Sequence, residues 1–300
     1  MKSKTILLVG LVAMFFLVFN SACEEEDNLQ TGTLSLSITD APTDDTSITG
    51  VYITIDSLQY HKQNNSWATF GEYGGPKKVN LLELTDGFSE LLGNFEMESG
   101  QYNQLRFILD APVRGQGTPS NPGCYLEYEN GDTKPLFVPS GGQTGYKGVG
   151  AFTVPSNGTV EITADFDVRK SVVEAGVTGM YILKPTIRLV VDNQAGTIAG
   201  SVSNIPDETG ITVFAYENDE YSDTEAAEPA AEENRFPNAV TSDVVGAEGG
   251  YQLNYLAPMV YDLVVVSYVD GEFQEVLGKV EDVTVESNET TSEPIDLSSL

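Results

Sequence analysis

The sequence has few of the residues on which most catalytic and metal sites depend. Its 300 residues include only two cysteines, one histidine and one tryptophan. A lone histidine, His61, excludes a zinc site built from several histidines, and the sequence contains no G-x-S-x-G nucleophile elbow. Two cysteines, Cys23 and Cys124, cannot supply a disulfide framework. We therefore expect a hydrophobic core to stabilise the fold, and we expect no cofactor.

Basic residues are scarce as well. The chain has 15 lysines and arginines against 45 acidic residues, for a formal net charge of −30. Such a surface repels the phosphate backbone, so nucleic acid is excluded as a partner, and a basic patch for anionic lipid is not expected. This acidity suits a solvated extracellular surface, and it leaves calcium open as a ligand.

Long apolar runs are absent except near the N-terminus. Lys2 and Lys4 precede an unbroken apolar run at residues 6–19, which ends in the small residues Ser21 and Ala22. This order is typical of a secretory signal peptide. As a helix the run would extend about 21 Å, which is short against a hydrocarbon core of about 30 Å. We therefore predict a signal peptide over residues 1–22, and a tilted or snorkelled membrane anchor is the alternative.

The end of this segment, Ser21-Ala22-Cys23, resembles the lipobox of bacterial lipoproteins, and four acidic residues follow it at 24–27. The resemblance implies that Cys23 is acylated and holds the protein to the membrane through a lipid anchor, with residues 23–30 as an acidic tether. It implies an outer-membrane lipoprotein exposed at the cell surface; a periplasm-facing lipoprotein and an ordinary secreted protein are the alternatives. An anchor with two or three acyl chains needs no protein span.

Apolar and polar residues alternate along most of the remaining chain, which predicts β-strands. The longest alternation runs over residues 160–168, and a shift of its phase at Asp56-Ser57 in an earlier strand predicts a β-bulge. Leu84, Phe88, Leu91 and Leu92 fall at helical spacing and predict one short helix, which Gly87 and Gly93 limit.

Residues 192–196 are typical of a linker, and a second series of strands follows them. Within that series, residues 217–237 are rich in acids and alanine, so we expect an acidic mobile loop there. The predicted fold class is all-β, with two β-sandwich-like modules in tandem after the signal peptide, at residues 31–192 and 196–300.

Two further resemblances concern these modules. Residues 31–192 resemble an uncharacterised family of bacterial surface lipoproteins through Thr39-Asp40-Ala41-Pro42, residues 100–106, Asp165-Phe166-Asp167 and Leu183-Lys184-Pro185. Residues 196–300 resemble carboxypeptidase-regulatory-like modules through residues 200–202, 250–253 and 261–265. That resemblance implies a small transthyretin-type sandwich that serves as a structural or binding unit. Carbohydrate recognition is an analogy at the level of fold class.

Aromatic residues provide the first candidate site. Exposed rings hold sugars because they supply flat apolar area together with a hydrogen-bonding edge. Four aromatic residues cluster in sequence near a predicted loop, and we take them as a candidate ligand platform that faces solvent. They are Tyr60, Trp67, Phe70 and Tyr73.

Carboxylates provide two other candidates. Oxygen ligands for calcium occur at Asp40, Asp44 and Asp45, although their spacing is not that of an EF-hand loop. A second acidic cluster lies at residues 219–223. Charge repulsion within a mobile acidic loop explains this cluster without a metal ion. Asp165 and Asp167 lie on one face of a predicted strand at a separation that glycoside hydrolysis tolerates, but a solvated acidic face is the interpretation we favour.

The sequence therefore predicts a non-catalytic cell-surface lipoprotein that binds a ligand, carbohydrate or another envelope component such as a protein, or that acts as a structural display module. A carboxylate-dependent glycan hydrolase is the first alternative, and it requires Asp165 and Asp167 to lie in a cleft. A calcium-stiffened adhesin is the second.

Overall fold

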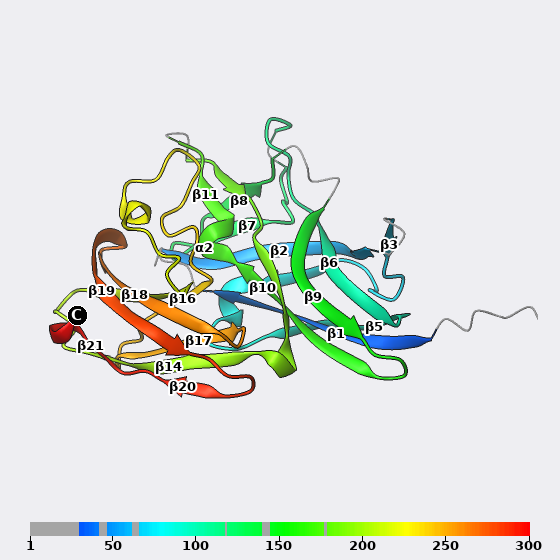
Figure 1. Cartoon of the computed structure of the whole chain (residues 1–300). Helices are drawn as coiled ribbons and strands as arrows, with labels where there is room; N and C mark the ends of the chain where they lie inside the picture. Colours follow the sequence, from blue (N-terminus) through cyan, green and yellow to red (C-terminus); the bar gives the residue numbers. More distant parts are fainter. Residues whose placement is uncertain (1–29, 42–46, 62–65, 118, 140–144, 177–178) are drawn as a thin grey trace, which may run out of the picture. The chain divides into compact units, whose positions relative to one another are not determined.

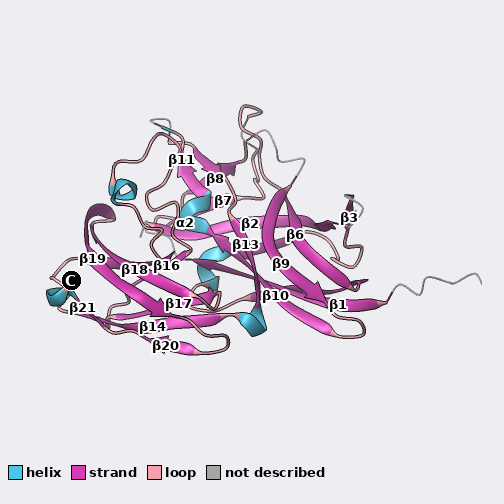
Figure 2. Cartoon of the chain, viewed as in Figure 1, coloured by secondary structure: helices cyan, strands magenta, loops and turns pink. Residues whose placement is uncertain are grey.

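The alternating segments of the chain form β-strands. The computed structural model describes residues 30–41, 47–61, 66–117, 119–139, 145–176 and 179–300. Strands dominate, and the helices are single short turns, so the predicted all-β class is confirmed (Figures 1 and 2). No helix in these residues is long and apolar enough to cross a membrane.

The first thirteen strands hydrogen-bond into one sheet. Its order is β11-β12-β8-β7-β2-β6-β9-β13-β10-β1-β5, and β3 and β4 both pair with β2. The strands are β1 (Thr31–Ala41), β2 (Ile48–His61), β3 (Trp67–Thr69), β4 (Lys77–Asn80), β5 (Glu90–Glu98), β6 (Gly100–Leu109), β7 (Tyr125–Tyr128), β8 (Thr133–Phe137), β9 (Tyr146–Val154), β10 (Thr159–Asp167), β11 (Val172–Glu174), β12 (Tyr181–Leu183) and β13 (Ile187–Val191).

One core fills this part of the molecule. Its largest members include Phe95, Phe107 and Phe166, each at most 1% exposed. Cys124 is fully buried in the same core, where burial raises the pKa of its thiol to about 12. The thiol is therefore an inert packing group.

Residues 196–300 form two smaller sheets. One has the order β17-β14-β20, with β21 also paired to β14, and the other has the order β16-β15-β18-β19. Their shared core is distinct from that of the first sheet. The strands are β14 (Gly196–Ser203), β15 (Gly210–Glu217), β16 (Thr241–Val244), β17 (Gly250–Leu256), β18 (Val260–Val269), β19 (Glu272–Thr284), β20 (Thr290–Ser292) and β21 (Ile295–Asp296).

The short helices connect strands. A four-residue α-helix, α2 (Val168–Ser171), continues directly from β10. Its N-cap is Asp167, whose side chain accepts a hydrogen bond from the Lys170 N–H. The 3₁₀ helices are η1 (Leu81–Leu84), η4 (Asp192–Gln194), η5 (Asp223–Ala226) and η6 (Leu297–Ser299). Residues 31–300 form one compact unit.

Two local predictions can be compared with this fold. The register of β2 against β6 shifts between Ile55 and Ser57, so the predicted bulge is confirmed. The helix predicted from Leu84, Phe88 and Leu91 is wrong, because η1 ends at Leu84 and β5 begins at Glu90. Gly87, with φ at 81°, breaks the segment, and Phe88 stays 68% exposed instead of packing as a helical face would.

Candidate functional site

A groove opens on the first sheet where its strands diverge. A turn at residues 155–158 connects the end of β9 to the start of β10. Strand β13 lies between these two strands only at the ends far from this turn, where it pairs with β9 at Gly148 and Val149. The groove has a volume of about 760 Å³, within the range of small-ligand sites. The thirteen lining residues are His61, Gln101, Tyr102, Asn103, Ala151, Phe152, Thr153, Pro155, Thr159, Val160, Val191, Asn193 and Gln194.

Backbone geometry explains the position of the groove. The backbones of β9 and β13 approach so closely that a Cβ atom at Gly150 would lie 2.2 Å from the Leu189 carbonyl oxygen. Glycine is therefore required at this close contact. On the other side of β9, the register of β6 shifts between Tyr102 and Gln104, which changes the residues that β6 presents outward.

The described lining of the groove carries no acidic or basic side chain, although the protein is strongly acidic. Among the lining residues that the structure describes, none is an aspartate, glutamate, lysine or arginine. Four exposed amide side chains supply most of its polar groups, and none of the four makes a side-chain hydrogen bond within the described residues. They are Gln101, Asn103, Asn193 and Gln194. Each amide offers both donors and an acceptor to a ligand.

The wall of the groove formed by η4 is attached to the C-terminal region. Asn288 donates from its side chain to the Asn193 carbonyl at 2.8 Å and from its backbone to the Ala195 carbonyl at 2.7 Å. Two of the amides therefore stand on a turn that residues 196–300 help to hold.

The only tryptophan stands beside one end of the groove. The rings of His61 and Trp67 lie 5.0 Å apart, and the Arg106 guanidinium lies over the indole, 3.7 Å from its centroid. Arg106 also donates to the Gln59 side chain at 3.3 Å, and burial lowers the pKa of its guanidinium. Since His61 lines the groove, this stack connects Trp67 to the site.

The four aromatic residues of the predicted platform do not form one solvent-facing surface. Phe70 is only 5% exposed and packs against Phe95, with ring centroids 4.5 Å apart. Tyr73 is half-buried and donates to the Ile55 carbonyl at 3.2 Å, and burial raises the pKa of its hydroxyl. Tyr60 packs on Phe70 at 4.8 Å. The other three rings belong to or border the core, so only Trp67 remains as a candidate, and its contact with a ligand stays a prediction.

Of the three calcium candidates, the structure describes only Asp40. Asp44 and Asp45 lie outside the described residues. Asp40 is 7% exposed, and its Oδ1 accepts a hydrogen bond from the Val168 N–H at 2.9 Å, at the first residue of α2. Within the part of the chain that the structure describes, no group of three or more acidic, histidine or cysteine side chains is arranged to hold a metal ion.

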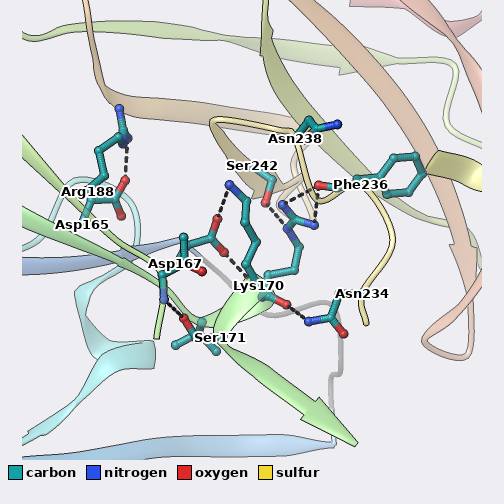
Figure 3. Close-up of polar contacts among 12 residues, drawn as sticks. Asp165, Asp167, Lys170, Ser171, Arg188, Asn234, Phe236, Asn238 and Ser242 are labelled. Carbon is teal, nitrogen blue, oxygen red and sulfur yellow. Dashed lines mark hydrogen bonds and ion pairs between the residues drawn. The ribbon is translucent and has the colours of Figure 1, made fainter. Parts of the chain in front are cut away.

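Asp165 and Asp167 do not lie on a solvated face, which corrects the interpretation favoured from the sequence. They are 5% and 4% exposed. Asp165 pairs with Arg188 at 2.5 Å, and Asp167 both caps α2 and pairs with Lys170 at 3.1 Å (Figure 3). The cavity beside Asp165 holds about 20 Å³, room for roughly one water molecule, so the cleft required for hydrolysis is not found there.

Basic residues of α2, of the segment after β12 and of β13 bind carbonyl groups of residues 196–300. Three of these acceptor carbonyls belong to non-glycine residues with φ between 54° and 63°, and Arg169 also donates to the Arg235 carbonyl at 3.0 Å. Lys184 donates to the Glu232 carbonyl at 2.8 Å, Arg169 to that of Phe236 at 3.4 Å, and Arg188 to that of Tyr255 at 2.7 Å. Figure 3 shows the contacts of Arg188 with Asp165 and of the segment near Asn234 and Phe236 with α2.

The acidic segment therefore packs where the sequence predicts a mobile loop over residues 217–237. Phe236 is fully buried, as is Ala239 just after the segment. Phe236 packs against Phe214 with ring centroids 4.6 Å apart. The Tyr216 hydroxyl donates to the Glu225 carboxylate at 3.1 Å. Phe236 thus anchors the end of a segment whose residues 217–235 are exposed or partly exposed, and the mobility of that segment stays a prediction.

A buried carboxylate lies at the same interface. Asp243 on β16 is 5% exposed and accepts a hydrogen bond from the Gln252 N–H at 2.6 Å. It shares the 20 Å³ cavity with Asp40, Asp86 and Asp165. Burial, with a contribution from the charge of Asp86, raises the pKa of Asp243 to about 6.

The predicted acylation site, Cys23, lies outside the described residues. The groove amides were not among the residues singled out from the sequence. Residues 100–106 were noted only for a family resemblance, and Asn193 and Gln194 only as linker. Neutral amides carry no motif, so only the strand pairing could reveal that they meet.

Residues 31–185 match the sequence profile of the family described as "Domain of unknown function (DUF4382)". Because the match covers more than half of the 300 residues, the chain belongs to this family. The matched region includes β6, β9 and β10 of the groove but ends before η4, so one wall is supplied by residues beyond it. No curated protein sequence matches the chain.

Solved structures show only distant similarity. The chain aligns with the Bacillus anthracis TIE protein at 11% identity and a TM-score of 0.22, over 88% of this chain and 34% of that one. It aligns with GBS52, the minor pilin of Streptococcus agalactiae, at 11% identity and a TM-score of 0.21, over 88% and 94% of the two chains. For the shaft pilin SpaA of Lactobacillus rhamnosus GG the values are 10% and 0.22, over 89% and 97%. The chain thus spans about a third of the TIE protein, and scores this low carry no implication for function.

Proposed function

We propose that this protein is a non-catalytic, surface-displayed lipoprotein that binds carbohydrate in the groove of its first sheet. The observation that carries the proposal is the absence of charged side chains from the described lining of a 760 Å³ groove in a protein of net charge −30. Amides that make no side-chain hydrogen bond to another described residue suit a ligand rich in hydroxyl groups, because each amide can donate to one hydroxyl and accept from another.

Trp67 contributes at the end of the groove in this proposal. Its stacking with Arg106 and His61 fixes the indole beside the lining residues. A flat ring at the rim gives the apolar face of a sugar a place to pack, while the amides supply orientation.

The anchor and the second module complete the proposal. The Ser21-Ala22-Cys23 sequence supports acylation of Cys23, which would hold the protein at the outer membrane, facing outward. Residues 196–300 would act as a carboxypeptidase-regulatory-like sandwich that supports the groove, since Asn288 holds the η4 wall. A structural display role is the second candidate, and the extensive polar contacts of Arg169 and Lys184 with residues 232–242 favour it.

A soluble protein of residues 28–300 tests the proposal, because residues 31–300 form one compact unit. It is titrated with a broad glycan panel while the fluorescence of Trp67, the only tryptophan, and the release of reducing sugar are followed. We expect saturable binding without product. Release of reducing sugar would contradict the non-catalytic role, and silence in both signals would favour structural display.

Replacing Trp67 sharpens the test. We expect Trp67→Ala to weaken glycan binding roughly tenfold, in line with the 1–3 kcal/mol that aromatic stacking contributes to other flat ligands. Calorimetry measures the affinity, since the variant has no tryptophan signal. The matched control is Tyr221→Ala, which truncates a partly exposed ring in the C-terminal region. Unchanged affinity in a folded Trp67→Ala protein would remove Trp67 from the site.

A further inference from the structure

A pair of basic residues lies on the same outer face as the groove. Arg106 of β6 and Lys147 of β9 are directly opposite in the antiparallel register. Their neighbours Leu105, Phe107 and Gly148 are buried, so Arg106 and Lys147 point outward. Side chains opposite one another in this register have Cβ atoms about 5 Å apart.

Neither of these residues has an acidic partner among the residues that the structure describes. Within the described residues, no ion pair joins Arg106 or Lys147 to a carboxylate, whereas seven other basic residues have such a pair. The Nε atom of Arg106 is buried and has no hydrogen-bond partner. Like charges that face one another across two strands are destabilising. In a chain with three acids for each base, this unpaired arrangement is a cost that an anionic ligand would remove.

The basic pair is continuous with the groove. Along β9 the outward residues run from Lys147 through Val149, which is 55% exposed, to Ala151 and Thr153 in the groove. At about 3.3 Å per residue, this strip extends roughly 20 Å. The stack of Arg106, Trp67 and His61 makes a second connection. A single extended ligand can therefore contact the basic pair and the amides together.

We infer that the groove selects an oligosaccharide that carries an anionic group, with neutral sugar units against the amides and a carboxylate or sulfate at Arg106 and Lys147. The inference rests on the proposed function and specifies its ligand class. The net charge of −30 repels densely charged polymers, but at physiological salt this repulsion is screened beyond about 8 Å. The ligand that fits best is therefore one with sparse acidic groups.

Matched ligand pairs test the inference. Oligogalacturonate is compared with its methyl ester, and a sulfated galactose oligomer with the unsulfated one, using Trp67 fluorescence and calorimetry. We expect the acidic member of at least one pair to bind roughly tenfold more tightly, because charge-assisted hydrogen bonds are about twice as strong as neutral ones. Inorganic sulfate alone should compete weakly.

Variants of the basic pair test whether Arg106 and Lys147 cause the preference for the acidic ligand. Lys147→Gln removes one exposed charge, and we expect it to weaken binding of the acidic ligand roughly fivefold while leaving the neutral ligand unchanged. Lys279→Gln is the control, because it makes the same charge change on exposed β19. Arg106→Gln should have a larger effect, but it also alters the packing of Trp67.

The outcomes separate the two proposals. Equal affinity for both members of each pair, or an equal loss in Lys147→Gln and Lys279→Gln, overturns the anionic preference and leaves carbohydrate binding in place. Binding of no member of either pair overturns the ligand class proposed here, whatever other glycans the panel identifies. A preference for the acidic member that Lys147→Gln reduces and Lys279→Gln does not supports both proposals.

Discussion

The outer face of β6 and β9 and the face covered by residues 196–300 use polar residues in opposite ways. On the covered face, charged side chains are buried and each meets a structural partner, as Asp165 does with Arg188 and Asp167 with Lys170. On the open face, the amides of the groove are exposed and make no side-chain hydrogen bond to another described residue, and no described carboxylate pairs with Arg106 or Lys147. The buried charged residues of the covered face thus stabilise the fold, while the exposed amides and the basic pair of the open face remain available to a ligand.

This contrast has an energetic basis. A buried charge must be paired or hydrogen-bonded, since leaving it alone costs several kcal/mol. The charged residues at the covered face are therefore fixed by their partners and have little freedom to meet a substrate. Exposed amides carry no such penalty, so a groove can retain them for ligand binding.

The largest effect should come from the covered face. We expect Phe236→Ala to destabilise the protein by about 3–4 kcal/mol, because it empties a fully buried aromatic position in contact with Phe214. The free energy of unfolding in urea measures the loss. Glu233→Ala, an exposed change in the same segment, is the control and should cost less than about 0.5 kcal/mol. A similarly small loss of stability for Phe236→Ala would contradict this expectation and support the mobile loop that the composition predicts.

A second effect at the covered face concerns pH. Asp243 has a raised pKa of about 6 in the folded protein, against about 3.9 when unfolded, so the folded state binds the proton more tightly. Its contribution to stability is therefore full below about pH 4 and is lost as the pH rises through about 6. We expect Asp243→Asn to be more stable than the wild type by roughly 2 kcal/mol at pH 7, because the amide keeps the acceptor for the Gln252 N–H without burying a charge.

Unfolding free energies of both proteins from pH 4 to pH 7 check this expectation. The difference between them should grow across the interval in which Asp243 ionises. The other carboxylates around the cavity, Asp40, Asp86 and Asp165, are unchanged in the variant, and Arg188 keeps its pair with Asp165. A constant difference would show that Asp243 does not titrate in this range. Asp86→Asn, which removes only the neighbouring charge, should show a smaller effect in the same direction.

The fold was more predictable than the site for a physical reason. Alternation along 160–168 and the phase shift at Asp56-Ser57 are local patterns, and both correspond to the observed strand and bulge. The burial of Asp165 and Asp167 depends on which residues cover that face of the sheet, and no local sequence pattern encodes this. Phe236 shows the same limit, because burial of one aromatic residue outweighed the composition around it. The groove is assembled from five strands and a turn, so its amides are adjacent only after folding.

The smallest effect on stability should come from the groove itself. Gln101 and Asn103 are exposed and make no side-chain hydrogen bonds within the described residues, so we expect the double variant Gln101→Ala, Asn103→Ala to unfold within about 0.5 kcal/mol of the wild type. Glycan affinity should nevertheless fall roughly tenfold, since two hydrogen-bonding groups are lost from the ligand contact. Thermal unfolding and calorimetry on the same samples measure both. The control Gln274→Ala, on exposed β19, should change neither. A double variant that lost stability without losing affinity would place these amides with the structural residues of the covered face and would remove the contrast between the two faces.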